Sequence, residues 1–216
     1  MRSVCRATIA WATLGLLGLA PLACTPEAVS VRHGPREYVA ADYRSVLQRW
    51  TRSENLTSLS AMDSFLSVTA TYESWDFRWA YVARYADDYR LTVDQQHTLL
   101  QSTLAETKGY HQFYVALYAQ RLPWADLTDD NPAWIVRLID SQGNETAPSE
   151  IEKIGRPGAI ELTYFPYTTP WRTVHRIRFP VRTAGGRDTI SSEAAWLGLR
   201  FAGAQGNQQL VWEIEG

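Results

Sequence analysis

The sequence predicts an α+β fold, an immunoglobulin-like antiparallel β-sandwich with an N-terminal helix and a two-helix insertion. Two observations lead to this prediction. The second half of the chain contains six short runs of strand-forming residues separated by turn signals, a density typical of sandwiches and barrels. Two segments with helical spacing lie before them, and helices segregated from antiparallel strands are typical of the α+β class.

The N-terminal part of this fold is predicted to hold a helix and then a strand. Residues 36–50 place apolar side chains such as Leu47 and Trp50 three or four positions apart, which predicts a helix with one apolar face. Leu66–Tyr72 alternates apolar residues with Ser and Thr, which is the two-residue period of a strand. A weaker strand is predicted near Leu56–Leu59.

The two inserted helices carry recognisable start signals. Ser74 is a suitable N-cap for a helix over Trp75–Tyr89. Thr92 and Gln95 have the spacing of a capping box, which predicts a further helix from Val93 to about Thr107.

The remaining strands are predicted from short runs rich in β-branched and aromatic residues. They are residues 113–118, 134–139, 160–165, 173–179, 197–201 and 210–214. Residues 110–216 are therefore expected to form the sandwich core. Residues 37–109 are expected to be mainly helical with one strand, and 37–216 together to form a single domain.

The chain begins with a leader of the kind that directs secretion. Arg2 and Arg6 precede an apolar run that ends at Ala23, and no acidic residue interrupts it. A transmembrane helix is the alternative, but the run is at or below the ~17–25 residues that a span needs. Residues 1–23 are predicted to be a signal peptide, and residues 24–36 a tether.

The end of this leader carries a family resemblance. Leu19–Cys24 resembles the lipobox of bacterial lipoprotein precursors, and the mature body is similar to uncharacterised bacterial lipoproteins. Ala23 and Cys24 fit the lipobox, whereas Pro21 stands where leucine is usual. The resemblance implies cleavage before Cys24 and acylation of that cysteine, for example with palmitate. Two or more acyl chains would hold the protein firmly on a membrane. Thr25, in place of the aspartate that signals inner-membrane retention, implies the periplasmic face of the outer membrane.

Composition argues against several classes of function. Without residues 1–23, the 216-residue chain keeps 193 residues, with 19 Lys and Arg against 23 Asp and Glu, so nucleic acid is not an expected partner. The only cysteines are Cys5 and Cys24, so the mature body can form no internal disulfide and no cysteine metal site. No cofactor is expected.

The predicted strand 173–179 offers the sharpest candidate for binding. Alternation places His175 on one face, while the other face carries three arginines, Arg172, Arg176 and Arg178. Such a row would suit phosphate, carboxylate or lipid headgroups. The alternative is a solvated face whose charges are paired by Glu161, Glu213 or another neighbouring acid.

A second candidate surface is the aromatic-rich segment 72–89. Exposed Trp75 and Trp79 would stack on sugars or dock an envelope protein partner. The alternative is that these rings are buried between the inserted helices and the sandwich.

Metal and catalytic signatures are weak. Asp126, Asp129, Asp130 and Asn131 cluster, but their spacing lacks the pattern of a calcium loop and suits turn chemistry, so no metal site is predicted. The sequence contains no nucleophile elbow, no His-Glu-x-x-His pair and no phosphate loop, so no catalytic residue is predicted.

Three functions remain open. We favour a non-enzymatic envelope lipoprotein with a binding or assembly role. An envelope hydrolase acting on cell-wall or surface glycan is the first alternative, and it would need two carboxylates in a cleft beside the helices. A carbohydrate-binding module is the second alternative, and it would show a planar row of exposed tryptophans.

Overall fold

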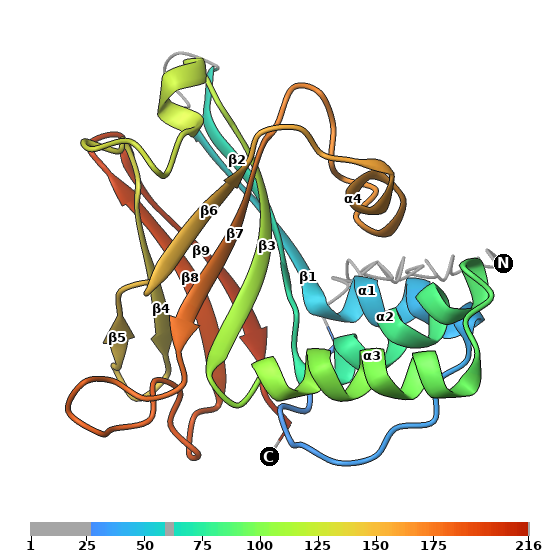
Figure 1. The fold of residues 1–216 in the computed structure, drawn as a ribbon. Coiled ribbons are helices and arrows are strands. Elements are labelled where there is room, and N and C mark those ends of the chain that lie inside the picture. Colours follow the sequence, from blue (N-terminus) through green and yellow to red (C-terminus); the bar gives the residue numbers. More distant parts are fainter. Residues whose placement is uncertain (1–26, 59–62, 216) are drawn as a thin grey trace, which may run out of the picture.

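The computed structural model describes residues 27–58 and 63–215. These residues form two antiparallel sheets and a group of helices, which confirms the α+β class and the two-sheet sandwich (Figure 1). The predicted signal peptide, Cys24 and Leu59 lie outside the described residues. No helix within the described ranges is long and apolar enough to cross a bilayer.

The larger sheet has the spatial order β1-β2-β3-β7-β6, and every neighbouring pair is antiparallel. Its strands are β1 (Thr51–Ser58), β2 (Asp63–Tyr72), β3 (Tyr110–Ala119), β6 (Glu150–Ile154) and β7 (Thr173–Pro180). The smaller sheet has the order β5-β4-β8-β9. Its strands are β4 (Ile135–Asp140), β5 (Glu145–Thr146), β8 (Trp196–Gly203) and β9 (Gly206–Glu213).

The order of the strands confirms the predicted two-sheet sandwich. β2, β3, β7 and β6 follow one another across one sheet, and β5, β4, β8 and β9 across the other, while β1 is an additional edge strand beside β2. The edge strands β1 and β9 lie next to each other, so the two sheets approach at that side.

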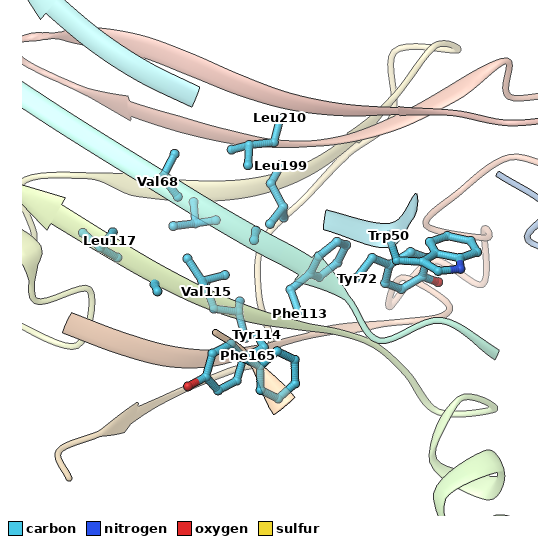
Figure 2. Close-up of a cluster of buried hydrophobic side chains, with 14 of the residues drawn as sticks. Trp50, Val68, Tyr72, Phe113, Tyr114, Val115, Leu117, Phe165, Leu199 and Leu210 are labelled. Atoms are coloured by element: carbon cyan, nitrogen blue, oxygen red, sulfur yellow. The ribbon is translucent and has the colours of Figure 1, made fainter. Parts of the chain in front are cut away.

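The core lies between the sheets and is built from alternate side chains. On β3, Phe113, Val115 and Leu117 point inward and are fully buried. Leu199 and Leu210 meet them from the second sheet (Figure 2). Burial of an apolar side chain of this size contributes about 1.5–3 kcal/mol, so this cluster holds the two sheets together.

Three helices pack together beside the sandwich (Figure 1). They are α1 (Tyr43–Trp50), α2 (Trp75–Asp88) and α3 (Val93–Glu106). Because α2 and α3 connect β2 to β3, they are the predicted two-helix insertion. Both start signals are confirmed, since the Ser74 hydroxyl accepts the Phe77 N–H and Thr92 forms the capping box with Gln95.

The first helix begins later than predicted because its expected first residues bind Asp76 of α2. The Asp76 carboxylate accepts hydrogen bonds from Arg36 at 2.9 Å, Tyr38 at 2.8 Å and Trp50 at 2.9 Å. It is only 5% exposed, so these donors replace water. The chain stays non-helical up to a 3₁₀ turn that begins at Ala40.

Part of the predicted tether is docked on the body. Val29 is fully buried, its N–H donates to the Glu213 carbonyl at 2.7 Å, and its carbonyl accepts from the Glu215 N–H at 2.9 Å. The Trp75 indole N–H donates to the Gly34 carbonyl at 2.6 Å. The chain from Val29 to Gly34 is therefore held against the domain.

The predicted strand over residues 160–165 is wrong, because these residues form the short helix α4 (Ala159–Tyr164). The Glu161 carboxylate accepts the Gly158 N–H at 2.8 Å and closes the first turn. Tyr164 and Phe165 are adjacent and both buried, whereas a strand would point them to opposite faces.

Two edge strands, β5 and β6, were not predicted. β5 has only two residues, and β6 reads Glu-Ile-Glu-Lys-Ile, a charged composition that blunts a sheet edge and gives little strand signal. The region 37–109, expected to hold one strand, holds β2 and also β1, which covers most of the predicted weak strand.

Candidate functional site

One loop covers the outer face of the five-stranded sheet and creates the candidate site. Residues 155–172, which include α4, form this covering segment (Figure 1). The Phe165 ring stacks on Tyr114 of β3 at 3.8 Å between centroids, on the side of β3 away from the core (Figure 2). Tyr167 bonds the Thr71 hydroxyl at 2.6 Å, and Thr168 bonds the Tyr114 hydroxyl at 2.9 Å. The segment is thus fixed to the sheet by a stacked ring and by side-chain hydrogen bonds.

The predicted arginine row lies on this covered face. On β7, His175, Ile177 and Phe179 are buried in the sandwich, so Arg176 and Arg178 project from the opposite face. Arg172 precedes the strand and its side chain bonds residues on the same outer face. The structure therefore brings all three predicted arginines to one face.

Two of these arginines are paired by the unpredicted strand β6. Arg178 donates to Glu150 at 2.8 Å and to the amide oxygen of Gln112 at 2.7 Å. Arg176 donates to Glu152 at 3.4 Å. The neutralising acids are thus neighbours on β6, while Glu161 caps α4 and Glu213 belongs to the other sheet.

Arg172 has a different environment. Its Nη1 donates to the Thr69 hydroxyl at 2.8 Å and the Ala116 carbonyl at 3.3 Å, and its Nη2 donates to the Ser67 hydroxyl at 3.2 Å. Among the residues that the structure describes, no carboxylate forms an ion pair with it. Burial lowers the pKa of this guanidinium, with a smaller opposing effect of Tyr167. A half-buried positive charge is therefore held in place by neutral groups only.

Arg172 lines a cavity of about 670 Å³, which we call the Arg172 cavity. Its walls come from the 3₁₀ turn η2 (Leu122–Ala125), the end of β6, the covering segment and the start of β7. Its apolar lining residues are Leu122, Pro123, Ile154, Pro157, Leu162, Pro170 and Val174. Its other charged lining residues, Lys153 and Asp126, pair with each other at 2.6 Å. The lining thus has one surplus positive charge.

A smaller cleft of about 230 Å³ lies between the covering segment, α2, α3 and the sheet; we call it the Glu73 cleft. Its central arginine is Arg78, which is 3% exposed. Arg78 lies 2.8 Å from the Glu106 carboxylate and 3.8 Å from that of Glu73. Glu73 also accepts from Gln112 at 2.6 Å, so the cleft is crossed by a continuous hydrogen-bonded network.

The predicted tryptophan surface is largely covered. Trp75 stacks on His33 at 4.5 Å between centroids and is half-buried. Trp79 is also half-buried, and its indole N–H is buried without a partner in the described ranges. Trp171, which was not predicted as a site residue, is 79% exposed.

The aspartate cluster forms local turn structure, and one of its members, Asp126, lines the Arg172 cavity. Asp126 and Asp129 each accept the N–H two residues ahead, which is turn chemistry. Lys153 and, to a lesser extent, Thr128 hold the pKa of Asp126 well below its usual range. No group of three metal-binding side chains occurs within the described residues. Burial lowers the pKa of His175 to about 4, so this side chain is neutral at pH 7.

No protein-family model, curated protein sequence or solved structure matches this chain. The functional assignment therefore rests on the chain's own side chains. The sequence pointed to Arg172 but gave no sign of its cavity, because the walls combine four segments that only the fold brings together.

Proposed function

We propose that this chain is a lipid-anchored envelope protein that binds a ligand or a partner protein through the covered face of its larger sheet. The lipobox-like segment that ends at Cys24 supports the anchor and a position at the periplasmic face of the outer membrane. The observation that carries the binding role is the Arg172 cavity. It has the size of a small-molecule site, an apolar lining and one positive charge that neutral groups position.

The alternatives have less support from the geometry. In the Glu73 cleft, Glu73 and Glu106 both contact Arg78, and Glu161 accepts a backbone N–H. None of them has the unpaired, apolar surroundings that suit the general acid of a glycoside hydrolase. Trp75 and Trp79 are half-buried, so they do not form the exposed row that a carbohydrate-binding module would use.

Changing the proposed anchor tests the proposal directly. We expect the native protein to fractionate with membranes and the Cys24→Ser variant to be released, because the variant has no thiol to acylate. Mass spectrometry of the purified native protein should find acyl chains on Cys24. An affinity pull-down with the anchored protein, compared with Cys24→Ser, identifies partners that need the membrane location. Unchanged membrane fractionation of Cys24→Ser, or a native protein with a bare thiol, would contradict the anchor.

A further inference from the structure

We propose that the Arg172 cavity binds an amphiphilic monoanion, a single apolar chain that ends in a carboxylate. This inference names the ligand class for the binding role proposed above and rests on that role. It follows from the charge, the free donors and the apolar lining of the cavity.

The donors of Arg172 suit a carboxylate. Arginine has five N–H donors, and the contacts to Thr69, Ala116 and Ser67 use three of them. The Nε–H and one Nη2–H have no partner in the part of the chain that the structure describes. Arginine binds carboxylates through two such parallel donors. The hydroxyls of β2 thus orient the guanidinium while leaving donors for a ligand.

The charge balance suits a single negative charge. Arg172 is the uncompensated cation of the lining, because Lys153 is already paired with Asp126 at 2.6 Å. A carboxylate would make the lining neutral overall. A doubly charged headgroup would leave one negative charge unpaired among apolar walls, which is unfavourable.

The walls suit an apolar chain. Leu122 is 76% exposed and Leu162 is 51% exposed, and they line the cavity from opposite segments, η2 and α4. Large apolar side chains that gather in the exposed part of a cavity mark a contact site. Ile154, Pro157 and Val174 extend this apolar surface. A short ion such as acetate would satisfy Arg172 but leave these side chains exposed to water.

Calorimetric titration at pH 7 with three probes separates the two halves of the proposal. The full chain carrying Cys24→Ser is titrated with decanoate below its micelle concentration, with decanol and with acetate. We expect decanoate to bind with one-to-one stoichiometry. We expect decanol and acetate each to bind at least about tenfold more weakly, because each lacks one of the two interactions.

Variants assign the effect to the cavity. Arg172→Gln should weaken decanoate about tenfold and leave decanol unchanged. Leu122→Ser and Leu162→Ser should weaken both probes, and these exposed positions tolerate substitution without loss of the fold. Arg176→Gln is the matched control, because Arg176 lies on the same strand face and is paired with Glu152, so decanoate binding should not change.

Three outcomes would overturn the proposal: no decanoate binding to the folded protein, equal affinity for decanoate and decanol, or unchanged decanoate affinity in both Arg172→Gln and the leucine variants. A thermal melt of each variant confirms that it is folded. These failures are distinct from failure of the proposed function. If Cys24→Ser releases the protein but decanoate does not bind, the anchor is supported and only this ligand class is excluded. If the native protein carries no acyl chains, the anchor is contradicted, but decanoate can still bind the cavity.

Discussion

The Arg172 cavity and the Glu73 cleft lie on the same covered face, and they differ in how their arginines are matched. In the cleft, Arg78 contacts two carboxylates, those of Glu73 and Glu106. In the cavity, Arg172 is positioned by two hydroxyls and a carbonyl. The arginine of the cleft is therefore paired with carboxylates, whereas the arginine of the cavity is not.

This difference separates a structural role from a binding role. A buried charge with its counterions already in place gains little from a ligand, and its removal leaves unpaired partners behind. An arginine that is held by neutral groups alone can still form a strong ion pair with a ligand. The stability of the cleft and the ligand affinity of the cavity should therefore respond to different substitutions.

The largest expected effect comes from removing the ring that holds the covering segment over both sites. Phe165→Ala should destabilise the protein by about 4 kcal/mol, because Phe165 is buried and stacks on Tyr114. Urea denaturation measures the loss, and decanoate titration at low temperature, where the variant is folded, should show weakened binding. Unchanged stability and binding would mean that this segment does not shape the sites.

A smaller effect is expected in the cleft. Arg78→Met should cost about 3 kcal/mol in urea denaturation, because it leaves the carboxylate of Glu73 without its cation. Arg172→Met is the matched variant and should cost only about 1 kcal/mol, because it leaves no carboxylate unpaired in the described residues. If the two variants lose equal stability, the contrast between the two sites is wrong.

The dependence of stability on pH between pH 7 and pH 5 should arise from two buried histidines, His175 and His111. Burial lowers the pKa of His175 and of His111 to about 4 in each case. Because the unfolded chain binds protons near pH 6.5 and the folded chain only near pH 4, stability falls as the pH drops through this window. Each histidine should contribute about 2 kcal/mol of loss between pH 7 and pH 5.

The variant His175→Gln tests this assignment. It keeps an acceptor for the Leu127 N–H, which His175 now accepts at 3.3 Å, and it cannot titrate. The acid-induced loss of stability, followed by urea denaturation at several pH values, should fall by about half. His97→Gln, at an exposed helix position, is the control for the substitution itself. A full acid response in His175→Gln would show that His175 does not cause the effect.

Local signals in the sequence predicted the elements that are governed locally. The caps at Ser74 and Thr92 depend on contacts three residues away, so the starts of α2 and α3 could be predicted. The alternation on β7 likewise placed Arg176 and Arg178 on one face. The fold class followed from the number of such elements.

Tertiary contacts decided what the sequence could not predict. Arg36 and Tyr38 bind Asp76 and so delay the first helix, although their spacing suits a helix. The acids that neutralise the arginine row lie on β6, whose own charged sequence hides the strand. Arg172 bonds neutral groups of Ser67 and Ala116, which are far away along the chain, so the sequence could not show that its charge is unpaired.

The docking of Val29 restricts how an anchored molecule could stand on its membrane. Cys24 and Val29 are five positions apart, so the chain between them reaches at most about 17 Å. Val29 pairs with Ile214 near the C-terminus. The 3₁₀ turn η2 lies at the other end of the sandwich (Figure 1), and two of its residues, Leu122 and Pro123, line the Arg172 cavity. A short tether at one end of the domain would direct the opposite end away from the membrane. A ligand would then reach the cavity from the aqueous compartment and not from the leaflet that holds the acyl chains.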